Sequence, residues 1–249
     1  MSRVRRTRGQ ALTSNVRQLI LNLVVTVSAV LFFLFVASDP NPQGTWLREG
    51  GVLEDAQALL FFLAAVGFFM AARRSDHLKQ GQLWRYLPIT AWILLMLVFF
   101  GEEISWGQRI FGLETPTTGV LSTNTQNEIN LHNLPFLRRL KVHFVNYLLI
   151  TVGLTLPLLT LLHPLKRAVR FFAIPISSLI FVPIFVGTFF MHDYRVYSFE
   201  EFGYSPREYS ETMMALAFAL FAWHGADNRD SLFLIPPRPG RSPAANLPD

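Results

Sequence analysis

The chain of 249 residues contains no cysteine, so disulfide bonds, metal sites with thiolate ligands and cysteine nucleophiles are all excluded. It also has little charge: Asp, Glu, Lys and Arg make up 16% of the residues, against roughly 25% in a soluble globular domain. Four common catalytic or nucleotide-binding signatures are missing too: H-E-x-x-H, G-x-S-x-G, G-x-x-x-x-G-K-[ST] and G-x-G-x-x-G. These absences remove several classes of soluble enzyme and leave few charges to cover a soluble surface.

Long apolar stretches fill the space between the charges, and the mean hydropathy is +0.33. A helix needs about 20 apolar residues to cross the hydrocarbon core of a bilayer. Five stretches approach or reach that length and a sixth is shorter: Leu19–Ala37, Val52–Ala72, Tyr86–Gly101, Phe144–Leu162, Phe171–Met191 and Thr212–Gly225. The first is longer than the core of a signal peptide, so we interpret it as a retained anchor. We predict an all-α, polytopic membrane helix bundle with about six transmembrane helices.

The basic residues predict its orientation. If the N-terminus is cytoplasmic, fifteen of the 22 lysines and arginines lie on the same side of the membrane: Arg3, Arg5, Arg6, Arg8, Arg17, Arg73, Arg74, Lys79, Arg85, Lys166, Arg167, Arg170, Arg229, Arg238 and Arg241. The outer side then holds the other seven, Arg48, Arg109, Arg138, Arg139, Lys141, Arg195 and Arg207. The positive-inside rule therefore favours an N-in, C-in arrangement. Because the arginines sit in short stretches between apolar runs and not on one soluble face, we expect no nucleic-acid partner.

Three regions follow from this topology. Residues 1–18 form a basic cytoplasmic N-terminus, and residues 19–226 form a six-helix transmembrane domain with a long outer loop at 102–143 between its third and fourth helices. Residues 227–249 contain five prolines and no apolar period, which predicts a disordered cytoplasmic tail. Within the fifth apolar stretch, Pro175 and Pro183 indicate either a packing kink or a hinge.

The acidic residues gather on the predicted outer side. Thirteen of the 17 lie there or at outer helix ends: Asp39, Glu49, Glu54, Asp55, Glu102, Glu103, Glu114, Glu128, Asp193, Glu200, Glu201, Glu208 and Glu211. Acidic residues contribute little to membrane orientation, so this distribution requires a local explanation. Two polar stretches are the densest, GEEISWGQRIFG at 101–112 and NTQNEINLHN at 124–133.

These two stretches contain the residues that are best suited to catalysis or metal binding. Adjacent carboxylates at the end of an apolar span, Glu102 and Glu103, are costly unless they have partners. If the third helix continues, Glu102 and Trp106 share one of its faces, and if residues 124–132 are helical, Glu128 and His132 lie in one stripe. A glutamate and a histidine four residues apart on a helix can ligate one metal ion.

We therefore assign candidate roles within and around these stretches. The candidate catalytic residues are Glu102, Glu103, Glu128 and His132. The candidate substrate-binding residues are Trp106, Gln108, Arg109, Asn124, Gln126 and Asn133. The candidate ligands of a divalent metal ion as cofactor are His132, Glu128, His143, His192 and Glu211.

The same stretches carry a resemblance. The run EEISWGQRIFG at 102–112, with Thr115-Pro116 and the later QNEINLHN at 126–133, resembles a family of uncharacterised bacterial multi-pass inner-membrane proteins. The stretch REGGVLE at 48–54 is similar to that family as well, so the resemblance covers roughly residues 48–135. It implies a location in the bacterial inner membrane and several spans, and it implies no particular activity.

Two classes of function follow from these observations. In the first, the protein is a membrane-embedded, metal-dependent enzyme that acts on a membrane lipid or lipid-linked substrate at the outer leaflet. In the second, it is a non-enzymatic transporter, sensor or assembly subunit, and the same residues form a structural or binding network. Convergence of Glu102, Glu128, His132 and Glu211 around one cavity would favour the enzyme, whereas dispersed positions, each paired with an arginine, would favour the second class.

Overall fold

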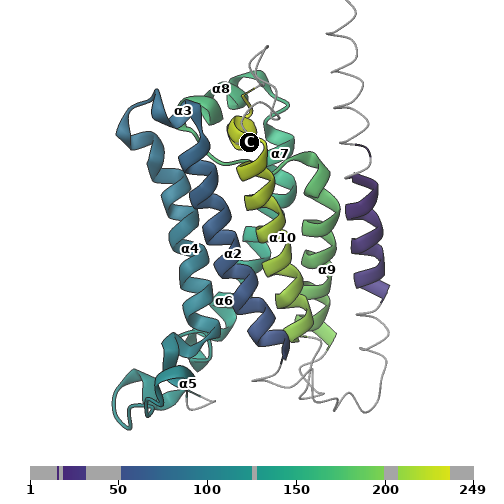
Figure 1. The fold of residues 1–249 in the computed structure, drawn as a ribbon. Helices are drawn as coiled ribbons and strands as arrows, with labels where there is room; N and C mark the ends of the chain where they lie inside the picture. Colours follow the sequence, from purple (N-terminus) through teal and green to yellow (C-terminus); the bar gives the residue numbers. More distant parts are fainter. Residues whose placement is uncertain (1–15, 17–18, 32–51, 125–127, 199–206, 236–249) are drawn as a thin grey trace, which may run out of the picture.

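A computed structural model of the protein describes residues 16, 19–31, 52–124, 128–198 and 207–235. This part of the chain is helical and contains no β-strand, which confirms the all-α prediction for it. The long helices run side by side in one bundle, and short helices lie at its two ends (Figure 1).

The long elements are α2 (Val52–Arg74), α4 (Leu87–Glu103), α6 (Pro135–Ile150), α9 (Val182–Ser198) and α10 (Arg207–Asp227). Their short companions are α3 (Asp76–Lys79), α5 (Gln108–Phe111), α7 (Leu156–Leu159) and α8 (His163–Phe172). Single 3₁₀ turns occur at Leu83–Tyr86, Ser105–Gly107, Val120–Thr123, Leu179–Phe181 and Arg229–Phe233. A further helical segment, Leu19–Leu31, lies beside α9, where Asn22 donates a hydrogen bond to the carbonyl of Ile180 over 2.9 Å (Figure 1).

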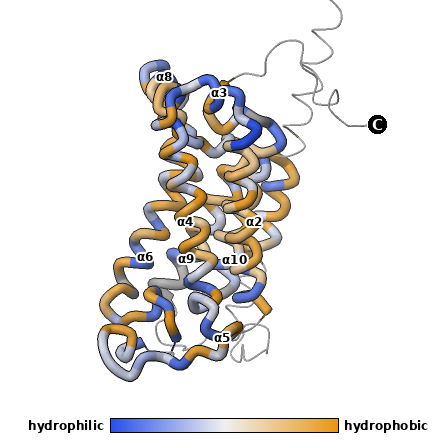
Figure 2. Tube along the Cα trace, turned by 60° about the vertical axis from the view of Figure 1, so that its left-hand side comes forward, coloured by the Kyte–Doolittle hydropathy of each residue, from blue (hydrophilic) through white to orange (hydrophobic). Residues whose placement is uncertain are grey.

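Three of the described segments are long and apolar enough to cross a membrane, Val52–Arg74, Leu83–Glu103 and Pro135–Leu159. Two more, Leu19–Leu31 and Leu179–Asp193, are apolar but shorter. Figure 2 shows hydrophobic residues along the middle of α2, α4 and α10, with hydrophilic residues gathered near α3 and α5 at the two ends. These three spans support the predicted multi-pass membrane protein.

The flanks of the bundle are apolar as well. Leu59, Phe62, Phe69, Leu94 and Val98 are all exposed on the long helices. Soluble proteins rarely expose contiguous apolar patches larger than several hundred Å², whereas lipid tails solvate such side chains readily. The lateral surface therefore fits a hydrocarbon environment.

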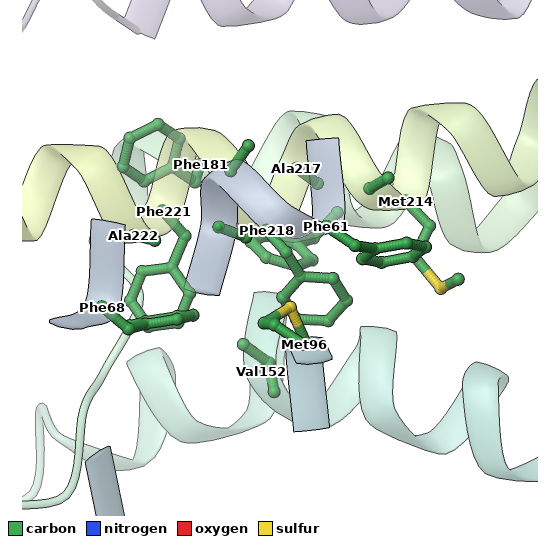
Figure 3. Close-up of a cluster of buried hydrophobic side chains, with 14 of the residues drawn as sticks. Phe61, Phe68, Met96, Val152, Phe181, Met214, Ala217, Phe218, Phe221 and Ala222 are labelled. Carbon is green, nitrogen blue, oxygen red and sulfur yellow. The ribbon is translucent and has the colours of Figure 1, made fainter. Parts of the chain in front are cut away.

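Helices α2 and α10 form the centre of the bundle. Phe61 and Phe68 of α2 and Phe218 and Phe221 of α10 are fully buried there (Figure 3). The rings of Phe68 and Phe221 meet edge to face with their centroids 5.2 Å apart, a favoured aromatic geometry. Small residues bring the backbones close, since a Cβ atom on Gly67 would lie 2.9 Å from the Cβ of Ala222.

Two predicted span boundaries are wrong. The fourth span begins at Pro135 and not at Phe144, because α6 includes the basic residues that precede Phe144. The fifth does not begin at Phe171: α8 ends at Phe172, residues 174–178 are not helical, and the next helical turn begins at Leu179. Pro175 explains the break, because proline has no N–H to donate and disfavours a helical conformation at the residue before it.

The prediction of a tail disordered from Asp227 onward is also wrong for its first part. The 3₁₀ turn Arg229–Phe233 packs against the bundle with Leu232 and Phe233 buried. The carboxylate of Asp230 accepts hydrogen bonds from the Ser75 hydroxyl (2.6 Å) and the His77 amide (3.2 Å). Residues 236–249 lie outside the described part of the chain, as do nearly all of residues 1–18.

Gly153 marks the closest approach between α9 and the continuation of α6. It lies in the π-helical segment Thr151–Thr155, which widens because Pro157 cannot donate to the carbonyl four residues earlier. A Cβ atom on Gly153 would collide with the Cβ of Phe185 on α9.

We predict that Gly153→Ala lowers the stability of the purified protein in detergent, because α9 must move away from the segment. Overpacking of this kind costs about 1–3 kcal/mol. Thermal unfolding measures the effect, and Thr155→Ala is the control because Thr155 is exposed on the same segment. Equal melting temperatures for the two variants would contradict this packing.

Candidate functional site

The first polar stretch begins where α4 ends. Ser105, Trp106 and Gly107 follow with φ angles of 48°, 52° and 85°, all in the left-handed region. Gly107 adopts this conformation easily, but each of the two non-glycine residues costs of order 1–3 kcal/mol there. The chain turns away and forms α5, so the third helix does not continue through this stretch. Such a turn persists only if surrounding contacts hold it.

Glu102 supplies the first of those contacts. Its Oε1 accepts a hydrogen bond from the Trp106 indole over 2.7 Å, so these two residues do meet as predicted, although across a turn and not along a helix face. Its Oε2 accepts the backbone amides of Leu131 (2.7 Å) and His132 (2.8 Å). The Glu102 side chain is almost completely buried, with the residue 7% exposed. One carboxylate thus joins the end of α4 to a segment about thirty residues further along the chain.

Glu128 supplies the second contact. Its Oε2 accepts hydrogen bonds from the Ser105 hydroxyl (3.0 Å) and the Asn130 amide group (2.6 Å). Asn124 in turn donates to the backbone and side-chain oxygens of Asn130 over 2.9 and 2.8 Å. Ser105, Asn124 and Asn130 are buried. Sequence reasoning missed Ser105 and Asn130, and their only signal was their position inside the two polar stretches.

Gln108 closes the network from α5. Its side-chain oxygen accepts the amide of Ile129 over 2.6 Å, and its side-chain nitrogen donates to the hydroxyl of Thr115 over 2.9 Å. Asn133 is buried at the same end of the bundle. Gln126 and the side chain of Arg109 lie outside the described residues. The two polar stretches therefore form one hydrogen-bonded unit, which we call the outer-loop network after the side predicted for it: Glu102, Ser105, Trp106, Gln108, Asn124, Glu128, Asn130 and His132.

The stripe that a helix over residues 124–132 would place Glu128 and His132 in does not form, because residues 128–134 are not helical. Glu128 binds Ser105 and Asn130, whereas His132 lies against Glu102, with its Nδ1 3.3 Å from Oε2. A carboxylate beside Nδ1 favours the tautomer with the proton on that nitrogen.

The other predicted metal ligands belong to separate contacts. Lys141 of α6 and Glu211 of α10 form an ion pair over 3.3 Å, and Glu211 is 2% exposed. His192 of α9 is fully buried and lies 2.6 Å from the side-chain oxygen of Asn146. His143 is exposed. Within the described part of the chain, no group of three or more His, Asp or Glu side chains has the arrangement of a metal site, so the predicted ligand set does not fit one there.

Exposed apolar side chains adjoin the outer-loop network along the chain. The Trp106 ring lies over Gly101, where an added Cβ atom would come within 2.9 Å of the ring. Trp106 is 49% exposed, and the neighbouring Ile110, Phe111 and Leu113 are exposed too. Figure 1 shows α5 and its loops beyond the ends of the long helices. The site thus combines hydrogen-bonded carboxylates in its interior with aromatic and aliphatic side chains on its surface.

We predict that Glu102→Leu loosens residues 129–133 without unfolding the bundle. Leucine has no acceptor for the amides of Leu131 and His132, and a buried donor without a partner costs about 1–3 kcal/mol. Hydrogen–deuterium exchange of these two amides should accelerate roughly tenfold or more. Glu114→Leu is the matched control, because Glu114 is exposed in the same loop. Unchanged exchange in Glu102→Leu would contradict the anchoring role of this carboxylate.

The chain was compared with protein families, curated proteins and solved structures, and none of them matches it. The resemblance carried by the two polar stretches therefore stays a prediction. Any function has to be argued from the arrangement of the outer-loop network itself.

Proposed function

We propose that this chain is a bacterial inner-membrane protein with six crossings and both termini in the cytoplasm, and that its outer loop is a folded, non-enzymatic binding surface for a lipid or lipid-linked ligand. The observation that carries the proposal is the use of Glu102 and Glu128. Both carboxylates accept hydrogen bonds from the loop's own backbone and side chains. They build the loop, and the loop exposes a run of apolar side chains at Trp106, Ile110, Phe111 and Leu113.

The directions of the helices support six crossings. Thr212 near the start of α10 donates to the carbonyl of Leu53 near the start of α2, over 3.5 Å. At the other end of the bundle, Arg74 of α2 donates to the carbonyl of Ala226 of α10 over 3.0 Å. The two helices therefore run in the same direction, which requires an odd number of crossings between them. Helices α4, α6 and α9 provide three, and the apolar segment Leu19–Leu31 precedes α2.

The exposed apolar side chains support the class of ligand. Burial of a Phe or Ile side chain is favourable by about 1.5–3 kcal/mol of free energy, and full exposure to water loses this contribution. Ile110 and Phe111 are 67% and 73% exposed, and Trp106 and Leu113 adjoin them just beyond the end of a membrane span. Acyl chains at the outer leaflet are the partner that this position and this chemistry fit. The rigid network below holds the four side chains in place before the ligand binds, which lowers the entropic cost of binding.

A second function is favoured by one specific contact, the approach of Glu102 to the Nδ1 atom of His132. A carboxylate that orients an imidazole in this way makes its Nε2 atom a general base. In this function His132 is the general base that accepts a proton from the reacting group, and Glu102 is a positioning residue that orients the imidazole. Turnover of an extracted membrane lipid that disappears in His132→Ala, while the exchange pattern of residues 129–133 stays unchanged, would replace the binding function with this one.

The orientation can be tested directly because the chain has no cysteine of its own. We predict that Thr118→Cys in the outer loop reacts with a membrane-impermeant maleimide in intact spheroplasts. Gln80→Cys at the opposite end should react only after lysis, since the two exposed positions flank α4 and α5 on different sides. The unmodified protein is the background control. The reverse pattern would show that the protein has the opposite orientation. Labelling of both variants before lysis would show that α4 does not cross the membrane.

Lipid contact of the loop can be tested with the same chemistry. We predict that a fluorophore attached at Phe111→Cys is quenched by phospholipids brominated in their acyl chains when the protein is in nanodiscs. The same fluorophore at Thr118→Cys should respond only to a quencher dissolved in water. If the label at position 111 is as accessible to the aqueous quencher as the label at 118, the apolar surface does not face lipid and the proposed ligand class is wrong.

A further inference from the structure

The opposite end of the bundle carries a second surface that the outer loop does not explain. Helix α8 leaves the bundle after α7 and lies beside α3 at this end (Figure 1). Val169 of α8 is buried, and Arg170 donates two hydrogen bonds to the carbonyl of Leu234, over 2.6 and 2.9 Å. The Nε2 atom of His77 lies 2.9 Å from the carbonyl oxygen of Arg170. This helix is therefore fixed to the bundle along one side only.

Away from these contacts, α8 exposes several apolar side chains. Phe171 and Phe172 are 56% and 49% exposed, and Leu165 is exposed one to two turns earlier. Both phenylalanine rings contact Trp84, with centroids 5.3 and 5.8 Å from the indole. Trp84 belongs to the 3₁₀ turn that leads directly into the α4 span, and Leu87 just after it is exposed as well. Aromatic side chains at the end of a span, beside exposed aliphatic ones, are characteristic of the boundary between headgroups and hydrocarbon.

Four cations lie on the elements that carry this aromatic group or adjoin it: Arg85 follows Trp84 in the 3₁₀ turn, Lys166 and Arg167 belong to α8, and Lys79 ends α3. None of the four forms an ion pair within the described part of the chain. Arg85 lies over the Trp84 ring with its guanidinium carbon 5.7 Å from the centroid, and its buried Nε has no hydrogen-bond partner among the described residues. Of the aspartates described at this end, Asp230 binds Ser75 and His77, Asp227 lies 3.9 Å from Arg74, and Asp76 lies in the first turn of α3 and has a contact of its own. Among the described residues, cations therefore outnumber carboxylates at this end.

We propose that α8 and the turn Leu83–Tyr86 form a binding site for an anionic phospholipid of the adjacent leaflet. The acyl chains lie against Leu165, Phe171 and Phe172, and Lys166, Arg167 and Arg85 bind the phosphate of the headgroup. A guanidinium that lies over an indole face keeps its N–H groups in its own plane, where they can point outward. This fork of donors matches the oxygen atoms of a phosphate. Charge complementarity decides the class of lipid, since a zwitterionic headgroup offers this cluster no net attraction. The site lies at the other end of the bundle from the outer loop and does not depend on the function proposed for that loop.

The test uses the full-length protein purified in a neutral detergent. Its thermal unfolding is measured with added phosphatidylglycerol, with phosphatidylcholine and with inorganic phosphate. We expect a saturable rise in melting temperature with phosphatidylglycerol only. The double variant Lys166→Gln/Arg167→Gln should bind phosphatidylglycerol roughly 30-fold more weakly, the effect of two lost cations near an anionic headgroup. The control is Arg138→Gln/Arg139→Gln, which removes the same charge from α6 near the opposite end and should leave the response unchanged.

Three results would overturn the proposal. An equal rise with phosphatidylcholine would show a general lipid effect, and an equal rise with inorganic phosphate would show an anion site without a lipid. An equal loss of response in the control variant would show dependence on net charge and not on α8. If the Lys166/Arg167 variant does not fold, native mass spectrometry of the unmodified protein decides: retention of phosphatidylglycerol over phosphatidylcholine supports the site, and equal retention of both contradicts it.

Discussion

A buried carboxylate at the end of a membrane-spanning helix needs hydrogen-bond donors, because neither lipid nor a dry protein interior solvates it. Glu102 receives them from the Trp106 indole and from the amides of Leu131 and His132. The first contact holds the left-handed turn that ends α4, and the other two return the chain to α4 after the loop. Without this carboxylate the turn loses its contact through Trp106 and the returning chain loses its direct attachment to α4, so the shape of this end of the bundle depends on it.

The same kind of contact closes the other end of the bundle. Asp230 and Arg170 bind backbone and side-chain groups of neighbouring elements and hold the C-terminal turn in place. Apolar packing alone discriminates poorly between helix arrangements in a membrane, because lipid tails are as apolar as leucine. Close approach at Gly67 and Gly153 and directional contacts at the two ends therefore decide which helices are neighbours and in what register.

These contacts bear on the role of the acidic residues. Carboxylates next to a histidine at membrane depth have the composition of a catalytic site, but here Glu128 is bound to Ser105 and Asn130, and Glu211 is paired with Lys141. Their charge is used to fold the protein. The two ligand surfaces that we propose use the apolar side chains beside the outer-loop network and the cations of α8 and its neighbouring turn. Both surfaces have the chemistry of lipid contact, one through acyl chains and the other through headgroups.

The sequence by itself determined the helical class, the spans α2 and α4 to within a few residues, and the two stretches that form the polar outer end. Each of these follows from local pattern, since the length of an apolar run and the spacing of charges do not depend on distant residues. Only the tertiary structure decided that Glu102 binds Leu131 and His132, that Ser105 and Asn130 are buried partners of Glu128, and that residues 128–134 are not helical. It also decided that the segment after Asp227 packs on the bundle. These partners are up to about thirty residues apart within the loop, and further apart for the tail. The path of the chain between them depends on hydrogen bonds that a periodic pattern in the sequence does not reveal.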